Sequence, residues 1–500
     1  MEKAIRVTVN GKVKFVDAGA LLSEVIIGEK PCGGHGKCGK CRVIAKGNLS
    51  SPTETERKFL DEANLARGYR LACMTRAIGD CEITTAQEEK MHIAVDGNLP
   101  AFQINPTFYN YGVAIDIGTT TIVAKLYDRS GRLLASTSHL NPQQKWGADV
   151  ISRIEAALKG DASKLAKSVR FSLISAIQDL ANASKIETNQ IDGVVITGNT
   201  VMLSLLCEES VLPFSSAPFE AKRLFGEEIS AGELGIQCLK QHIPIYLAPC
   251  ISAFVGADTV CAIIATQLCL GSTAMLADIG TNGELALWHK NKLTVCSTAA
   301  GPAFEGVGIS MGMRGESGAI DKVSIQNGKL VPHTINDTDP IGICGSGLVD
   351  AIACMLEIGA LDEVGYFEGD KFVISGSVCV FPKDIRMFQL AKSAIFAGIM
   401  SLIEDGDLTI EDVQSLFIAG GFGNYLNHYN AMKIGLIPQK LNGATKAVGN
   451  AALAGATMLL LSHNKRYEAE KLAKKAKVLD LATNPTFSRL FFAGMTLEPM

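Results

Sequence analysis

The chain has 500 residues, of which 47% are apolar and 20% charged, with a formal net charge of −4. This composition excludes disordered and fibrous proteins, and the charge offers no basic surface for a nucleic acid. One hydrophobic core seldom serves so long a chain, so the sequence predicts two or three domains. No charged and apolar leader segment precedes the first strand pattern, so we expect a cytoplasmic protein.

Residues 1–85 have the pattern of a small β-grasp domain. Apolar residues alternate over Ile5–Val9, Lys12–Val16 and Cys81–Thr84, which predicts three strands. A short helix is expected over Ala20–Ile27. These elements would surround a glycine-rich loop that contains three cysteines.

Four cysteines predict an iron-sulfur site. Their spacing is C-x5-C-x2-C followed by a distant fourth cysteine, and the candidate ligands are Cys32, Cys38, Cys41 and Cys73. Thiolates that converge on two irons need a tight loop, which the interleaved glycines permit. The alternatives are a zinc site, Cys81 as the fourth ligand, or a Rieske-type role for His35. Zinc modules usually pair two C-x2-C motifs, Cys81 lies in a predicted strand, and Rieske centres need two histidines.

The cysteine spacing resembles the adrenodoxin-like variant of the plant-type ferredoxins, which implies a [2Fe-2S] cluster. Residues 86–110 then have the composition of a linker, with little periodicity. A linker of this length would let the ferredoxin domain move between two partners. We expect a ferredoxin-like domain at 1–85, this linker, a first ATPase lobe at 111–268, and a second lobe with a C-terminal tail at 269–500.

Two segments with the same turn sequence begin these lobes. Gly112–Asp128 and Met275–Trp288 each place D-I-G-T between two apolar strands, and this repetition predicts two similar lobes. Glycine brings backbone N–H groups close to phosphate oxygens, threonine hydroxyls add donors, and the aspartate can hold Mg²⁺. The candidate residues are Asp116, Gly118, Thr119 and Thr120 in the first turn, and Asp278, Gly280, Thr281, Asn282 and Gly283 in the second.

A buried strand that ends in a glycine turn follows in each lobe, at Gly193–Thr200 and at Leu416–Asn424. These elements, in this order, resemble the superfamily of acetate and sugar kinases, heat-shock ATPases and actin, whose fold is ribonuclease H-like. The resemblance implies that the two D-x-G turns bind the phosphates of ATP, with Asp116 and Asp278 as catalytic residues. It also implies that Gly420 and Gly421 hold the adenosine.

One long uncharged segment and two acidic residues have more than one possible interpretation. Thr259–Ala277 has no charge and is nearly long enough to span a bilayer. Its polar Gly271-Ser272-Thr273 break instead indicates a buried helix followed by a buried strand, so we expect no membrane partner. Asp258 and Glu305 fall near the expected cleft, and the sequence does not decide between a functional and a structural role for either.

The ferredoxin-like and ATPase-like parts together resemble one family, the reductive activators of corrinoid proteins, over essentially the whole chain. The resemblance implies an enzyme that uses ATP to transfer one electron from its cluster to a corrinoid protein of a methyltransferase system, returning Co(II) to Co(I). An upstream low-potential electron donor is implied as well, and we keep a homodimer as an expectation. Some members have C-terminal [4Fe-4S] motifs, whereas the last cysteine here is Cys379.

Two other functions are compatible with the sequence. One is a ferredoxin whose ATPase-like domain only binds a partner, and the other is a small-molecule kinase with a ferredoxin appendage. A kinase would need a base or histidine for its substrate, and none of the eight histidines can be assigned to that role. ATP turnover separates the first alternative from the activator.

Overall fold

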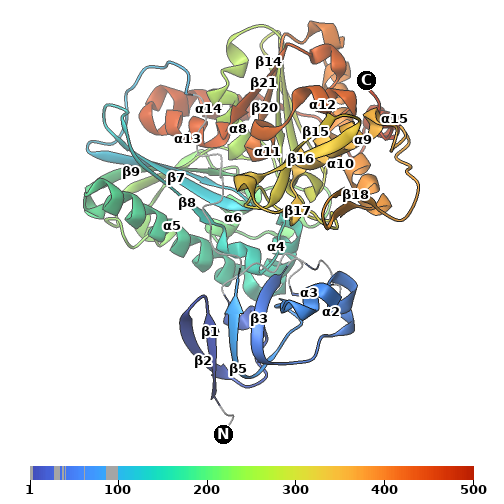
Figure 1. Cartoon of the computed structure of the whole chain (residues 1–500). Helices are drawn as coiled ribbons and strands as arrows, with labels where there is room; N and C mark the ends of the chain where they lie inside the picture. The colour runs from blue at the N-terminus through green and yellow to red at the C-terminus, as the bar shows by residue number, and fades with distance from the viewer. Residues whose placement is uncertain (1–3, 27–33, 37–38, 40, 61, 86–98) are drawn as a thin grey trace. The chain divides into compact units, whose positions relative to one another are not determined.

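The computed structural model describes residues 4–26, 34–36, 39, 41–60, 62–85 and 99–500 (Figure 1). The described residues form two compact units. One comprises those of Met1–Met91 with Pro142–Asp161, and the other those of His92–Asn141 with Ala162–Met500. Each unit has its own sheets and is described by itself.

A mixed five-stranded sheet forms the first unit, in the order β2-β1-β5-β3-β4. Strands β1 (Ala4–Val9) and β2 (Lys12–Asp17) make an antiparallel hairpin, and β5 (Ala77–Thr84) lies parallel to β1. Side chains of β1 alternate, so that Ile5 and Val7 point into the core. The predicted β-grasp arrangement is confirmed, although β5 begins well before Cys81.

The predicted helix near residue 20 is shorter than expected. Helix α1 covers only Leu22–Val25, because Ile26 is already extended, with φ −88° and ψ 142°. The other elements of the first unit are β3 (Arg42–Leu49), α2 (Glu54–Phe59), α3 (Glu62–Ala66), β4 (Tyr69–Leu71) and α4 (Val150–Ala156).

Two mixed six-stranded sheets form the second unit. Their orders are β10-β11-β9-β6-β7-β8 and β21-β20-β12-β13-β14-β22. Each contains a three-stranded antiparallel meander whose first strand also pairs with a parallel strand: β9 beside β6, and β20 beside β12. The duplication predicted from the two D-I-G-T segments is therefore present in the strand order.

The strands of the first sheet are β6 (Tyr111–Ile117), β7 (Thr121–Asp128), β8 (Leu133–Leu140), β9 (Ile191–Gly198), β10 (Glu227–Ser230) and β11 (Pro244–Leu247). Those of the second are β12 (Ala274–Ile279), β13 (Gly283–His289), β14 (Lys292–Thr298), β20 (Ser415–Ala419), β21 (Thr445–Gly449) and β22 (Lys477–Val478). Smaller sheets contain β15 (Ala319–Gln326), β16 (Lys329–Thr334), β17 (Gly342–Ile343), β18 (Phe372–Ser375) and β19 (Val378–Val380).

The helices of the second unit pack on these sheets. They are α5 (Ala162–Ser184), α6 (Thr200–Leu206), α7 (Ala231–Leu234), α8 (Ala257–Ala265), α9 (Gly345–Glu357), α10 (Pro382–Asp405), α11 (Gly420–Tyr425), α12 (His428–Lys433), α13 (Ala451–Leu461), α14 (His463–Lys475) and α15 (Pro485–Ala493). Helix α13 is late in the chain but packs against α8 and against β6 and β9 of the first sheet. A Cβ atom at Gly455 would lie 1.9 Å from the carbonyl oxygen of Cys261, so this crossing requires glycine.

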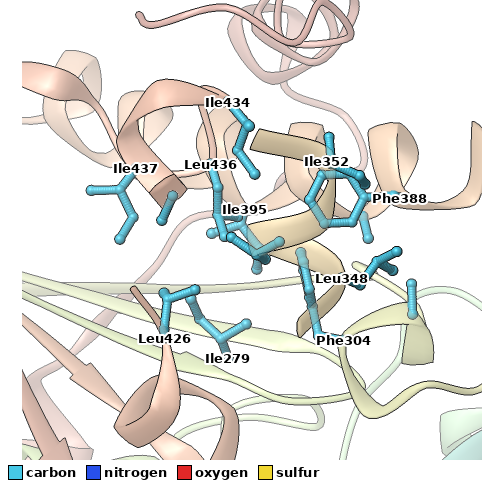
Figure 2. Close-up of a cluster of buried hydrophobic side chains, with 14 of the residues drawn as sticks. Ile279, Phe304, Leu348, Ile352, Phe388, Ile395, Leu426, Ile434, Leu436 and Ile437 are labelled. Atoms are coloured by element: carbon cyan, nitrogen blue, oxygen red, sulfur yellow. The ribbon is translucent and has the colours of Figure 1, made fainter. Parts of the chain in front are cut away.

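The hydrophobic core beside the second sheet is built largely from α9, α10 and the segment after α11 (Figure 2). Phe304 lies in it, fully buried, with its ring edge-to-face to Phe388 at 5.8 Å and stacked on Phe422 at 4.7 Å. This packing fixes the backbone that presents Glu305. The stacking of Phe304 on Phe422 also joins that backbone to α11, which begins with Gly420 and Gly421.

The uncharged segment Thr259–Ala277 contains the end of α8, a turn, and the start of β12. Strand β12 lies between β20 and β13, so the expected buried helix and buried strand are present. Among the described residues, one helix, α10, is long and apolar enough to cross a bilayer, and 78% of its most apolar window is buried inside the protein.

Candidate functional site

Two of the four predicted cluster ligands lie in the described part of the first unit. The Sγ atoms of Cys41 and Cys73 are 3.1 Å apart, and the backbone N–H of Cys73 donates to Cys41 Sγ at 3.4 Å. The hydrogen bond from Cys41 lowers the pKa of the Cys73 thiol to about 7, against the effect of burial. Cys32 and Cys38 lie outside the described residues.

The glycines of the cysteine loop allow its close packing. Gly36 and Gly39 have φ of +66° and +65°. A Cβ atom at Gly39 would lie 2.6 Å from the ring of Phe59, and one at Gly36 would lie 2.9 Å from the sulfur of Met74. A side chain at either position would therefore collide with Met74 or Phe59, so this part of the loop requires glycine.

The alternatives raised for the cluster ligands have different surroundings. Cys81 lies in β5 opposite Val7, in the core of the sheet, where burial raises the pKa of its thiol. His35 is exposed. Of these three residues, Cys73 is the one whose sulfur contacts that of Cys41.

The two D-I-G-T turns occupy equivalent places in the two sheets of the second unit. Asp116 lies near the end of β6 and Asp278 near the end of β12. The turns are tight, because Gly118 N–H donates to the Thr121 carbonyl and Gly280 N–H to the Asn282 carbonyl, both at 2.9 Å.

Residues outside the turns contact the two aspartates and Thr119. Asn450 Nδ2 donates to Asp116 Oδ2 at 3.1 Å, and Asn199 Nδ2 donates to Thr119 Oγ1 at 3.3 Å. Gly420, with φ +88°, approaches Asp278 so closely that a Cβ atom would lie 2.7 Å from Oδ1. A Cβ atom at Gly421 would meet nothing within 4 Å, so the start of α11 is open there.

Glu305 connects the two turns directly. Its Oε1 accepts a hydrogen bond from Thr281 Oγ1 at 2.8 Å, and its Oε2 accepts one from Thr120 Oγ1 at 3.3 Å. Gly280 lies beside the same carboxylate. The sequence left the role of Glu305 open, and the structure places it between the two candidate phosphate turns.

Several carboxyl groups influence one another in this region. Burial and the charge of Asp258 raise the pKa of both Asp116 and Asp278 to about 7. Burial likewise raises the pKa of Asp258 itself to about 6. Burial and the charges of Asp258 and Asp278 raise the pKa of Glu284 well above its usual range. Such mutual repulsion is relieved when a cation binds, so the site favours one.

A cation here would need ligands from outside the protein. Within the part of the chain that the structure describes, no group of three or more His, Cys, Asp or Glu side chains lies close enough to hold a metal. Mg²⁺ usually keeps several waters and takes one or two carboxylates together with phosphate oxygens. The carboxyl groups fit that mode of binding.

Sequence reasoning missed two residues of this region. Glu284 lies directly opposite Asp278 in the β12–β13 pair, and its signal was a single carboxylate at the start of an apolar strand. Asn450 caps α13, and its signal was an asparagine immediately before eleven residues without charge. Gly283, which was predicted to bind phosphate, packs against Ile395 of α10, where a Cβ atom would lie 2.2 Å from Cδ1.

Comparison with known families matches three consecutive regions of the chain. Residues 7–77 match the 2Fe-2S iron-sulfur cluster binding domain, residues 111–270 the RACo middle region, and residues 272–500 the C-terminal domain of RACo, the ASKHA domain.

Two relatives and one solved structure are similar over most of the chain. The corrinoid activation enzyme RamQ of Eubacterium limosum is 34% identical over 446 residues, which are 80% of this chain and 73% of the relative. The Co(II) methylated amine-specific corrinoid protein reductase of Methanosarcina barkeri is 25% identical over 431 residues, 78% of each chain. The structure of a reductive activator for corrinoid, iron-sulfur protein has a TM-score of 0.70 and 28% identity, and covers 99% of this chain and 98% of its own.

Proposed function

Because the chain belongs to the RACo family of reductive activators of corrinoid proteins, we propose that it uses ATP to drive one electron from its [2Fe-2S] cluster to a corrinoid protein, returning cobalt from Co(II) to Co(I). The corrinoid protein is the substrate of this reaction. It serves a methyltransferase system, in which Co(I) accepts the methyl group.

The bridge at Glu305 supports this proposal most directly. Thr120 and Thr281 belong to turns of different sheets, and their hydroxyls donate to the same carboxylate. Two turns that both donate hydrogen bonds to one carboxylate group are close enough to bind the phosphates of one nucleotide. A plain electron carrier would have no need for such a pair.

In this proposal Asp116 and Asp278 are the catalytic residues of ATP hydrolysis. They would hold Mg²⁺, which would supply positive charge next to the phosphates, and they would orient the water that attacks the terminal phosphate, since positioning and charge supply most of the catalysis in phosphoryl transfer. The two turns bind the phosphates, and the proposed phosphate-binding residues are Gly118, Thr119, Thr120, Gly280, Thr281, Asn282 and Gly283. Gly420 and Gly421, at the open start of α11, hold the adenosine.

Cys32, Cys38, Cys41 and Cys73 are the proposed cluster ligands. The cluster, when bound, supplies a one-electron reductant, and plant-type centres have potentials near roughly −400 mV. The chain holds the thiols of Cys41 and Cys73 together, and the loop before Cys41 packs on Met74 and Phe59 through Gly36 and Gly39. The lowered pKa of Cys73 favours the thiolate that iron requires.

ATP is needed in this scheme because the electron moves uphill. For one electron, each 59 mV of unfavourable potential costs about a factor of ten in the equilibrium. Nucleotide phosphates compete with Glu305 for Thr120 and Thr281, so binding and hydrolysis change what connects the two turns. We propose that this change alters how the protein engages the corrinoid protein and so favours Co(I).

The rest of the scheme follows from the same division of the chain. Residues 1–85 hold the cluster, residues 86–110 act as a tether, and the lobes at 111–268 and 269–500 bind ATP with Mg²⁺. A separate low-potential donor reduces the cluster. We propose that the protein works in the cytoplasm, without membrane or nucleic acid, and can form a homodimer.

The deciding experiment mixes the purified protein with a Co(II) corrinoid protein and a reductant under anaerobic conditions, and follows Co(I) by its absorbance. Co(I) should form with Mg-ATP but not with ADP or without nucleotide. Equal rates with and without ATP, at a solution potential well above that of the cobalt couple, contradict the proposal. ATP consumption together with phosphorylation of a small molecule would support a kinase instead.

A further inference from the structure

Helix α2 of the first unit contains a fully buried carboxylate, Glu56, that no part of the proposed chemistry uses. It forms an ion pair with Arg70, with Nε–Oε1 at 2.9 Å and Nη2–Oε2 at 3.2 Å. The side chains of Glu56 and Arg70 are 0% and 7% exposed. Burying an ion pair costs free energy unless further hydrogen bonds satisfy both groups, so such a pair needs an explanation.

The remaining hydrogen bonds of Glu56 lead to the loop that contains Cys73. Its Oε1 accepts from the backbone N–H of Leu71 at 3.1 Å and from Thr75 Oγ1 at 2.8 Å. Its Oε2 accepts from the backbone N–H and the hydroxyl of Thr53, at 2.9 and 3.2 Å, which caps α2. Leu71 and Thr75 lie two residues before and two residues after Cys73, so one carboxylate ties both ends of its loop to α2.

The loop in turn positions groups around the sulfur of Cys41. The N–H of Ala72 donates to the Cys41 carbonyl at 2.8 Å, and the N–H of Cys73 points at Cys41 Sγ. The N–H of Thr75 closes the loop on the Leu71 carbonyl at 3.0 Å. Any change in the anchoring of Leu71 and Thr75 must therefore move the Cys73 thiol and the N–H group directed at Cys41.

We propose that Glu56 is a positioning residue for the iron-sulfur site, holding Cys73 in place and setting the reduction potential through its charge and through the N–H group directed at Cys41. This inference rests on the proposed assignment of Cys41 and Cys73 as cluster ligands. Hydrogen bonds to the sulfurs and nearby charge are among the features that set the potential of such clusters.

Glu56→Gln is the direct test, because glutamine has the same shape but one acceptor oxygen and one NH2 group. Whichever way the amide turns, its NH2 group faces donors from Arg70 and from Thr53 or Leu71. At least one buried donor then loses its acceptor, and the positive charge of Arg70 is left without its partner. Glu54→Gln is the matched control, since Glu54 is exposed and lies in the first turn of the same helix.

Both variants are made in the full-length protein, purified anaerobically, and compared with the wild type in three measurements. These are the rate at which the visible absorbance bleaches in a chelator, the midpoint potential, and the EPR spectrum of the reduced protein. Glu56→Gln should bleach at least ten-fold faster. Its reduced-to-oxidised ratio at a fixed solution potential should rise about ten-fold, which is ~59 mV for one electron. Glu54→Gln should match the wild type.

Two further variants keep the test decisive. Thr75→Val removes the hydroxyl that donates to Glu56 Oε1 and to the Leu71 carbonyl, and it leaves the ion pair of Glu56 with Arg70 in place. It should bleach faster than the wild type without the ten-fold rise in the reduced-to-oxidised ratio, and it replaces Glu56→Gln in the test if that variant does not fold. Cys73→Ser with a wild-type spectrum would overturn the ligand assignment itself. Glu56→Gln with a wild-type potential and EPR spectrum, even if less heat-stable, would show a merely structural role and overturn this proposal.

Discussion

Replacing Asp116 by asparagine is expected to stabilise the nucleotide-free second unit above neutral pH. Burial and the charge of Asp258 raise the pKa of Asp116 from 3.8 to about 7, and the pKa of Asp278 is raised to about 7 by the same causes. Between these pH values the folded protein keeps protons that the unfolded chain has released. The free energy of unfolding therefore falls as the pH rises from about 4 to about 7.

The size of the effect follows from these shifts. One pKa unit corresponds to about 1.4 kcal/mol, so a carboxyl shifted by about three units would cost at most about 4 kcal/mol when ionised. The carboxyl groups repel one another, and Asp116 and Asp278 are partly exposed to water, so the recoverable part of this free energy is smaller. We expect Asp116→Asn to regain about 1 to 2 kcal/mol at pH 8. The amide can still accept the hydrogen bond from Asn450.

Urea unfolding of the nucleotide-free protein in EDTA, at pH 6 and pH 8, measures this difference. The urea midpoint of the wild type should be lower at pH 8 than at pH 6, and Asp116→Asn should make the difference between the two midpoints smaller. Asp370→Asn, at an exposed carboxyl outside the two turns, should leave the difference between the two midpoints unchanged. If Asp116→Asn unfolds more easily than the wild type at pH 8, or keeps the full pH dependence, burial and repulsion of these carboxyl groups are not what destabilises the second unit at high pH.

Asp278→Asn should lower ATP hydrolysis by about 10² or more with the fold retained, because positioned charge supplies most of the catalysis, and unchanged turnover would exclude it from the reaction. Cys73→Ser should lose the reddish-brown colour and the iron, whereas Cys81→Ser should keep both; the reverse result would reassign the fourth ligand. Glu305→Gln removes a negative charge next to the phosphates and should tighten ATP binding in the absence of Mg²⁺ by about ten-fold, measured by calorimetry. Proteolysis within residues 86–110 should leave cluster reduction and ATP turnover intact but sharply slow Co(I) formation at micromolar protein, since a tether provides an effective concentration in the mM range.

Features of the candidate sites that depend on short stretches of sequence could be predicted. The two D-I-G-T turns were recognisable because a buried strand, an aspartate and a glycine turn follow one another directly, and the repetition identified both lobes. The strand order around Asp116 and Asp278 agrees with that expectation. The cysteine spacing likewise predicted that Cys41 and Cys73 lie together, because four cysteines at those intervals are typical of an iron-sulfur site.

Features that depend on contacts between distant segments could not be predicted from the sequence. Asn450 reaches Asp116 from a helix that begins more than 300 residues later, and no local pattern indicates that contact. The early end of α1 is decided by the extended backbone at Ile26, not by helix propensity. Glu56 had an ordinary signature, a helix cap with a glutamate three residues on, which predicts a surface helix start more readily than a buried ion pair.

The packing of α13 has a consequence for how the protein is made. Leu461 ends a helix that fits against α8 and the first sheet, so the ribosome must release nearly the whole chain before the lobe that begins at Tyr111 can bury its surface. The strands of the N-terminal unit, by contrast, are all synthesised by Thr84. During translation the five-stranded sheet of the first unit can therefore form early, while the first sheet of the second unit cannot be covered by α13 until almost the whole chain has been synthesised.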